Sequence, residues 1–215
     1  MFGTVLSDDA TKTLAVLGKS GFLKDAYLAG GSGLALHLGH RISIDFDFFS
    51  NVPFQPEHLA KQLQTIGNFK PEVVKGISLI GSFEGIKFSY FGYDYPLIEK
   101  TTQYVDISIA DPKDIAAMKL VAITDRSTKK DYIDLYTIAQ KLYPLETMLT
   151  FYDQKYKLFD VNRFTLIKSL TFFQDAEETE MPNMLIPLKW EKVKQFFTSE
   201  SLRLGKKYLE EETSV

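Results

Sequence analysis

The chain has 215 residues, of which 45% are hydrophobic and 25% are charged, and it contains no cysteine. These values are typical of one folded domain or two small ones, and they exclude a disordered chain, a disulfide framework, a thiolate metal site and a cysteine nucleophile. The formal net charge of −3 argues against a protein coated in basic charge for indiscriminate nucleic-acid binding, although it leaves room for a local basic patch.

The N-terminus lacks the basic start and long apolar core of a signal peptide. No apolar run approaches the ~20 residues that span a bilayer. We therefore expect a cytoplasmic protein without a membrane partner.

The first half of the chain alternates between helical and strand patterns. Ser32 is expected to cap a short helix that Gly39 ends, and residues 81–84 are expected to form a hairpin turn. The expected elements are, in chain order, a helix over 7–19, a strand over 25–29, a helix over 32–38, a strand over 42–50, a helix over 56–66, and strands over 76–80, 85–91 and 103–109.

The pattern changes after residue 110. Asp111 is expected to cap a helix whose first position is Pro112, and nearly everything beyond reads as helix, with an exposed loop over 174–182. We therefore predict an α/β domain over residues 1–110 and a helical domain over 111–215 that completes a cleft. Residues 186–207 hold six basic and two acidic side chains, which fits either an RNA-facing helix or an amphipathic packing helix.

Two carboxylates lie in the strand expected over 42–50. Ile42, Ile44, Phe46 and Phe48 alternate with Ser43, Asp45 and Asp47, so the acids share one face and the apolar side chains the other. Two aspartates two residues apart in a strand lie roughly 7 Å apart at the backbone. Aspartate is a poor strand former, and a divalent cation such as Mg²⁺ would neutralise the pair. A solvated strand face is the alternative.

A glycine-rich turn precedes these acids. Gly30, Gly31 and Ser32 follow a strand and open a helix, an arrangement that presents free N–H groups to phosphate. A structural turn is the alternative for so short a motif. Arg41 can contact phosphate or cap the end of the helix.

A third group of charges follows Asp114. Lys119 and Arg126 lie on one helical face by their spacing, and Asp131 and Asp134 share a face of the next helix. Lys119 is either a surface residue whose ammonium reaches solvent or a phosphate ligand inside a cleft. The two aspartates are either catalytic or pair with Lys119, Arg126 or Lys130 to hold two helices together.

Three stretches together resemble the AbiEii/AbiGii toxin family of the DNA polymerase β-like nucleotidyltransferase superfamily. They are GGSGLALHLGHRISIDFDFFS at 30–50, GIKFSYFGYDYPL at 85–97 and DIAAMKLVAITDRSTKKDYIDLYTI at 114–138. Residues after 140 carry little of this signal.

The resemblance implies an α+β fold, a mixed sheet flanked by helices, and a Mg²⁺-dependent enzyme that moves a nucleotidyl group from a nucleoside triphosphate to an RNA, possibly tRNA. It implies the toxin of a toxin–antitoxin or phage-defence pair, with an antitoxin as partner. The implied site residues are Asp45 and Asp47 for the metal; Gly30, Gly31, Ser32, Ser43, Arg41 and Arg126 for the nucleotide; and Lys119, Asp134 and Asp131 for catalysis beside the metal pair.

The chain departs from the superfamily pattern at a third metal-binding carboxylate. The strand expected over 85–91 offers Ser89 and no acid. Asp94 and Asp106 are candidates by neighbourhood, and the family resemblance offers Asp134 as a substitute. This absence favours one alternative, a nucleotide-binding module without turnover. The acids at 45 and 47 with Lys119 favour a transferase, for which transfer to a small molecule or to a protein hydroxyl is the alternative to RNA.

Overall fold

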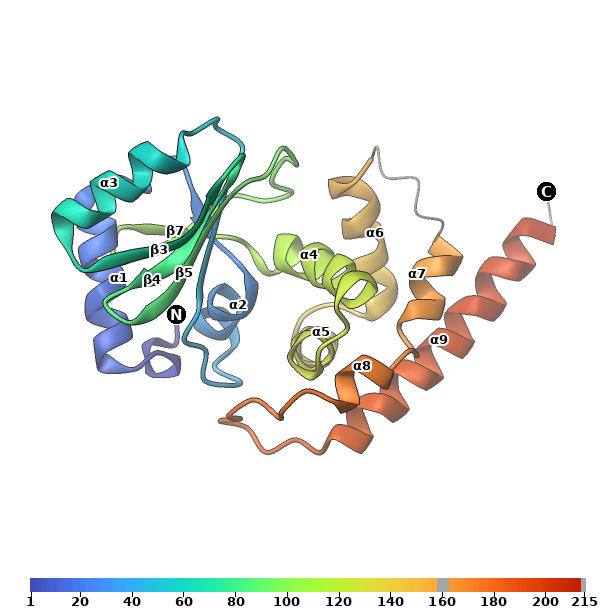
Figure 1. Ribbon diagram of the computed structural model, residues 1–215. Helices are drawn as coiled ribbons and strands as arrows, with labels where there is room; N and C mark the ends of the chain where they lie inside the picture. Colours follow the sequence, from blue (N-terminus) through green and yellow to red (C-terminus); the bar gives the residue numbers. More distant parts are fainter. Residues whose placement is uncertain (158–162, 214–215) are drawn as a thin grey trace. The chain divides into compact units, whose positions relative to one another are not determined.

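The computed structural model describes residues 1–157 and 163–213, and these fall into two compact units, Met1–Ile115 and Ala116–Val215. The first unit holds a sheet of seven strands in the order β3-β4-β5-β2-β1-β7-β6 (Figure 1). The sheet is mixed, because β1 pairs parallel with β7, and β2 with β5, while the other neighbours are antiparallel. The elements of this unit are η1 (Gly3–Val5), α1 (Asp8–Ser20), β1 (Tyr27–Leu28), α2 (Gly30–Leu38), β2 (Phe46–Ser50), α3 (Pro56–Ile66), β3 (Phe69–Lys75), β4 (Ser78–Phe83), β5 (Ile86–Gly92), β6 (Thr102–Tyr104) and β7 (Ile107–Ile109).

One face of the sheet forms the core of this unit. Phe46 and Phe48 of β2 and Phe88 of β5 are fully buried there, and apolar residues of α1 and α3 pack against them. Burial of such a face, at about 25 cal/mol per Å² of apolar surface, drives the folding of the sheet. The opposite face carries Asp47 and Phe49, which are only half-buried, because residues two apart in a strand share a face.

Two turns differ from the sequence expectation. β4 continues through Gly81, and the hairpin turn lies at Glu84 and Gly85, both with positive φ; Gly81 is needed inside the strand because a Cβ there would lie 2.3 Å from the Lys70 carbonyl oxygen. The strand expected over 103–109 is instead the hairpin of β6 and β7, whose turn residues Val105 and Asp106 have φ of 44° and 61°.

The second unit is helical throughout its described part. α4 (Pro112–Asp125) begins in the first unit and continues into this one, and Asp111 accepts a hydrogen bond from the Lys113 N–H at its start, as expected of an N-cap. The elements that follow are α5 (Lys129–Lys141), α6 (Leu145–Lys155), α7 (Arg163–Ser169), α8 (Gln174–Glu177) and α9 (Trp190–Thr213). The expected loop over 174–182 thus contains one short helix.

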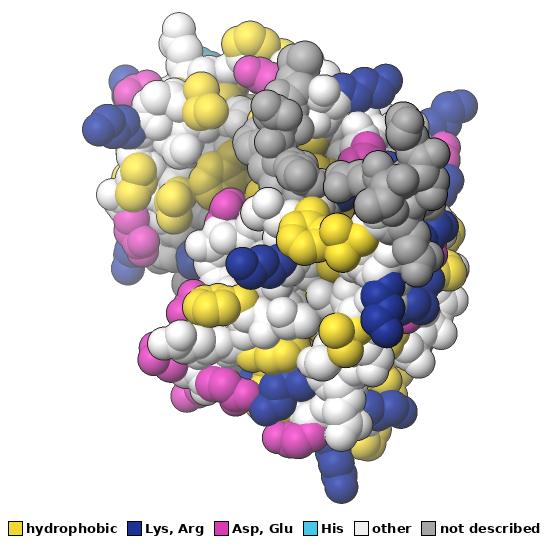
Figure 2. All heavy atoms as spheres, turned by 90° about the vertical axis from the view of Figure 1, so that its right-hand side faces the viewer, with side chains coloured by type: hydrophobic (Ala, Val, Ile, Leu, Met, Phe, Trp, Pro, Cys, Tyr) yellow, Lys and Arg dark blue, Asp and Glu magenta, His cyan; other side chains and the backbone are white. Residues whose placement is uncertain are grey.

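Helix α9 packs against its own unit through one face. Trp190, Val193 and Phe197 are buried, and the Phe197 ring lies 5.2 Å from that of Tyr132 in α5. Arg203 of the same helix pairs with Glu146 at 3.0 Å. On the molecular face drawn in Figure 2, lysine and arginine side chains are interspersed with acids. Of the two alternatives for this segment, the structure therefore favours the amphipathic packing helix. No helix in the described residues is long and apolar enough to cross a membrane.

Candidate functional site: a glycine turn, two acids and a buried ion cluster

The start of α2 has glycine where a side chain would crowd neighbouring groups. Gly30 adopts φ +60°, which favours glycine, and a Cβ there would lie 3.0 Å from Asp47 Oδ2. The helix begins at Gly30, with Ala29 as N-cap and no capping side chain, so the expectation that Ser32 caps it is wrong. Gly39, with φ 62°, ends the helix as expected, and its N–H donates to the Ala35 carbonyl. Because no side chain caps it, this helix start can offer backbone N–H groups to an anion.

Gly31 makes room for the side chain of Arg41. A Cβ on Gly31 would lie 2.2 Å from Arg41 Nη2 and 3.1 Å from Ser43 Oγ. Arg41 is 3% exposed, and its Nη1 donates to the Ile42 carbonyl at 3.2 Å. The helix start therefore combines the positive end of a helix dipole with a nearly buried guanidinium.

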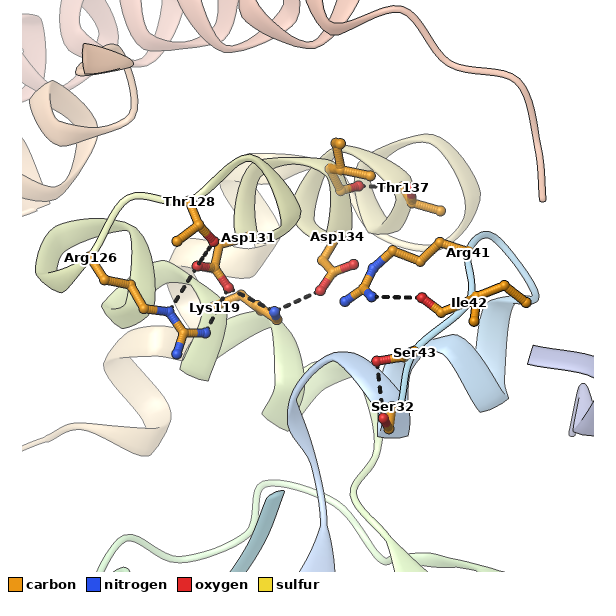
Figure 3. Close-up of polar contacts among 11 residues, drawn as sticks. Ser32, Arg41, Ile42, Ser43, Lys119, Arg126, Thr128, Asp131, Asp134 and Thr137 are labelled. Atoms are coloured by element: carbon orange, nitrogen blue, oxygen red, sulfur yellow. Dashed lines mark hydrogen bonds and ion pairs between the residues drawn. The ribbon is translucent and has the colours of Figure 1, made fainter. Parts of the chain in front are cut away.

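Ser32 and Ser43 tie this helix to the segment that precedes β2. Ser32 Oγ is hydrogen-bonded to Ser43 Oγ at 3.0 Å (Figure 3). Its single O–H proton is donated to the Asp45 carbonyl, so Ser43 is the donor in the Ser32–Ser43 pair. Both hydroxyls are buried. Their observed role is to hold Asp45 beside the start of α2.

The two acids occupy different backbone settings. β2 begins at Phe46, so Asp45 precedes the strand, and Ile44 is 58% exposed. The expected alternation over 42–50 is therefore wrong at Ile44, because the chain there is held by the Ser32 hydrogen bond and by a Ser43 N–H to Val5 carbonyl bond and not by a strand partner. Within β2 the alternation holds.

Asp47 lies within β2, and its side chain forms no hydrogen bond or ion pair with any described residue. Its register partner on β5 is Ser89, which is 3% exposed. Ser89 thus occupies the neighbouring strand position where the superfamily pattern would suggest a third acid. Asp94 is exposed, and Asp106 packs against Gly18 of α1.

The residues present suit Mg²⁺ delivered with a nucleotide. Among the described residues no group of three or more His, Cys, Asp or Glu side chains could hold a metal ion. Mg²⁺ in phosphate enzymes is commonly held by one or two carboxylates, with phosphate oxygens and water completing the octahedron. Asp45 and Asp47 supply hard oxygen ligands of this kind, and the Asp47 carboxylate borders the turn that could receive the phosphates.

A second cluster of predicted site residues lies in the helical unit. Lys119 of α4 places its Nζ 2.8 Å from Asp131 Oδ1 and 2.6 Å from Asp134 Oδ2 of α5 (Figure 3). Lys119 is 3% exposed and both aspartates are fully buried. The surface alternative for Lys119 is therefore wrong, and the pairing expected between the two helices is present.

Asp131 has further partners. Arg126 donates to it from Nε and Nη2, both at 3.0 Å, and Thr128 Oγ1 donates at 2.6 Å. Burial alone would raise the pKa of Asp131, but the charge of Lys119 and the hydrogen bonds and charge of Arg126 hold this pKa well below its usual range. Arg126 itself exposes 57% of its side chain, so its guanidinium can also reach a ligand.

Asp114 has a role that the sequence did not predict. Its buried carboxylate accepts the N–H groups of Ile98 and Glu99 at 3.0–3.2 Å, and so attaches the segment after β5 to the start of α4. In the sequence, Asp114 is only an acid in the first turn of a helix. Many helices have such an acid, so this pattern does not predict the contact with the segment after β5.

The chain resembles known proteins in sequence and in fold. The family model described as nucleotidyl transferase AbiEii toxin of a type IV toxin–antitoxin system matches residues 93–203. This confirms the family resemblance, whereas the expectation that residues after 140 carry little family signal is wrong. An uncharacterized protein of Aquifex aeolicus is 38% identical over 195 residues, which are 88% of this chain and 91% of the relative.

Three solved structures share the fold. A putative nucleotidyltransferase from Helicobacter pylori has a TM-score of 0.57 at 16% identity and covers 93% of this chain and 94% of its own. JHP933, also from Helicobacter pylori, has a TM-score of 0.53 at 15% identity over 97% of both chains. MenT4, a nucleotidyltransferase toxin from Mycobacterium tuberculosis, has a TM-score of 0.51 at 15% identity and covers 93% of this chain and 89% of its own. The expected α+β nucleotidyltransferase fold is confirmed.

Proposed function

Because the chain belongs to the AbiEii family of nucleotidyl transferase toxins, we propose that it moves a nucleotidyl group from a nucleoside triphosphate to an RNA with the help of Mg²⁺. The family makes the chain a nucleotidyltransferase of a toxin–antitoxin system. The RNA acceptor, with tRNA as first candidate, and the dependence on Mg²⁺ are our proposals.

One observation carries the proposal. The carboxylate of Asp47 is half-buried without a partner among the described residues, and it borders an uncapped helix start. A carboxylate repels phosphate, so the arrangement favours an anion only when a cation joins the two. Mg²⁺ bound by a triphosphate is such a cation.

We assign the roles in the first unit as follows. Asp45 and Asp47 hold the metal, whose chemistry is to draw charge from the phosphate oxygens. The N–H groups at Gly30 and Gly31, together with Arg41, receive the β- and γ-phosphates. Ser32 and Ser43 position Asp45 through the hydrogen bonds described above.

In the second unit, we propose that Lys119 and Arg126 meet phosphate charge. Lys119 is held by Asp131 and Asp134, so its ammonium is fixed in place before the nucleotide binds, which is the arrangement that stabilises developing charge most effectively. Asp131 accepts from three other side chains and is a positioning residue. Asp134 positions Lys119.

The reaction is a displacement at the α-phosphorus. A hydroxyl oxygen of the acceptor forms a bond to this phosphorus, the bond to the oxygen that bridges to the β-phosphate breaks, and pyrophosphate leaves. The hydroxyl proton is lost to solvent. Positioning and charge neutralisation supply most of the acceleration in such reactions.

Purified protein incubated with each α-labelled nucleoside triphosphate, Mg²⁺ and total RNA tests the proposal. We expect label in an RNA band with the wild type and none with Asp47→Asn, while Asp9→Asn, which removes an equal charge from a side chain 92% exposed on α1, behaves like the wild type. Label on a protein or a small molecule would favour the alternative acceptors. Nucleotide binding with no labelled product would favour a module without turnover.

A further inference from the structure

An aromatic row crosses three neighbouring strands on the sheet face that bears Asp47. The register sets Tyr27 of β1 opposite Phe49 of β2, and Phe49 beside Phe91 of β5. The ring centroids are 6.1 Å and 5.5 Å apart, with interplanar angles of 24° and 36°. Phe49 shares the face of Asp47 because the two are two residues apart in one strand.

The row is accessible in part and includes an unsatisfied donor. Phe49 and Phe91 are half-buried, and the ring of Tyr93 meets Phe49 edge-on at 5.2 Å. Tyr27 is 6% exposed, and its hydroxyl has no hydrogen-bond partner among the described residues. Buried hydroxyls in folded proteins nearly always have a partner, so this one is an unsatisfied polar group directly behind the half-buried rings.

Asp47 lies between this row and the helix start. Ala29 donates its N–H to the Asp47 carbonyl at 3.0 Å, and the chain passes from Tyr27 through Ala29 to Gly30, where α2 begins. Along β2 the row at Phe49 is therefore about 7 Å beyond Asp47, in the direction away from the helix start.

This order has a consequence for the displacement reaction. The attacking oxygen and the leaving group are roughly in line through the α-phosphorus. If pyrophosphate is held at the start of α2, the acceptor hydroxyl arrives from the opposite side of Asp47, which is the side of the aromatic row.

We propose that Phe49 and Phe91, with the buried Tyr27 ring packed beside Phe49, form the platform on which the last bases of a single-stranded RNA acceptor stack. This inference rests on the proposed function, since it takes the start of α2 as the triphosphate side. Aromatic rings bind single-stranded nucleic acid by stacking because every base presents a π-face. Such a platform prefers an unpaired end over a duplex, whose bases stack on one another.

Two variants test the platform through kinetics. Phe49→Leu and Phe91→Leu keep an apolar side chain and remove the ring. We expect each to raise the KM for RNA about 5-fold or more, since one stacked base contributes at least that much in proteins that bind single strands. The KM for the triphosphate should stay within about twofold. Phe54→Leu is the matched control, because Phe54 is half-buried and its ring contacts that of Tyr90 on the core face, with the centroids 4.4 Å apart.

A direct binding measurement uses the wild type alone. The full-length protein is bound to a single-stranded RNA oligonucleotide with 4-thiouridine at its 3′ end, and the complex is irradiated. The crosslinked protein is then digested with a protease and its peptides are identified. A blunt duplex of the same sequence is the control. We expect crosslinks to peptides that contain Tyr27, Phe49 or Phe91 with the single strand and not with the duplex.

The outcomes separate the two proposals. Three results would overturn the platform while transfer to RNA stands. They are an unchanged KM for RNA in both leucine variants, an equal rise of this KM in Phe54→Leu, and a rise of the KM for the triphosphate in place of that for RNA. If the wild type transfers no label to RNA, the proposed function fails, and the crosslinks still decide whether the row binds RNA. Crosslinks confined to other peptides would overturn the platform. Because this measurement uses the wild type, it decides the matter even if a leucine variant does not fold.

Discussion

Lys119 of α4 and Asp131 of α5 form an ion pair of 2.8 Å in which neither side chain exposes more than 4% of its surface. Asp134 lies 2.6 Å from the same ammonium. Including Arg126, the cluster has two positive and two negative groups, so its formal charge is neutral. A cluster of this kind fixes the direction of Lys119, but removing one member leaves uncompensated charge in a buried place.

Asp131→Asn should lower the free energy of unfolding by about 3 kcal/mol, the size typical of breaking a buried pair. Urea unfolding at pH 7 followed by circular dichroism measures it. The matched variant is Asp153→Asn, whose carboxylate is 36% exposed in its pair with Arg163 and should cost less than about 1 kcal/mol. Equal effects in the two variants would argue against the role of the cluster in stability.

Acid should lower the free energy of unfolding of the wild type by an amount that is absent in Asp131→Asn. The pKa of Asp131 lies below its usual range in the folded chain, and an unfolded aspartate titrates near about 3.9. The stabilisation is therefore present above about pH 4 and is lost as pH falls further, since the folded state must then take up a proton that it resists. The difference in unfolding free energy between the two proteins should shrink between about pH 4 and pH 2; a constant difference would refute this assignment.

Asp45→Asn and Asp47→Asn should each abolish nucleotide binding that depends on Mg²⁺, measured by titration calorimetry with and without the metal. Each change removes one charge from a like-charged pair. In metal-free buffer the thermal midpoint should hold or rise. Unfolding of both variants would make the acids structural.

Gly31→Ala should weaken nucleotide binding by roughly tenfold. The added Cβ would meet Arg41 Nη2 at 2.2 Å, so the guanidinium has to leave the helix start, and its charge-assisted contact with phosphate is worth about 1.5–3 kcal/mol. Gly205→Ala in α9 is the control, because nothing lies within 4 Å of its Cβ position and alanine favours a helix by about 1 kcal/mol. Calorimetric affinities and thermal midpoints of both variants decide the matter, and unaltered binding in Gly31→Ala would exclude Arg41 as a phosphate ligand.

Lys119→Ala and Asp134→Ala should each reduce turnover about 10²-fold or more, because one preorganised electrostatic partner of a transition state typically contributes that much. Single-turnover transfer to RNA measures it, with unfolding curves to correct for lost stability. If Asp134 acts by orienting Lys119, raising the Mg²⁺ concentration should not restore the activity of Asp134→Ala. Full activity in both variants would remove the cluster from the reaction.

The sequence by itself determined the features that arise from neighbouring residues. Local spacing and residue type predict the helix over Pro56–Ile66, the cap at Asp111, the stop at Gly39 and the change from strands to helices. These signals are local because a cap, a turn or an amphipathic face involves residues within one or two turns of the chain. The family was identified by the resemblance of three stretches of sequence.

Only the tertiary structure decided which distant groups meet. Lys119 is buried between two aspartates because α4 packs against α5. Gly31 is needed because Arg41, ten residues later, folds back over it. Rings from β1, β2 and β5 form one row because register sets them side by side. Periodicity assigns a side chain to a face, but its partner depends on long-range packing, and packing also explains why Ile44 faces solvent beside a strand whose alternation is otherwise regular.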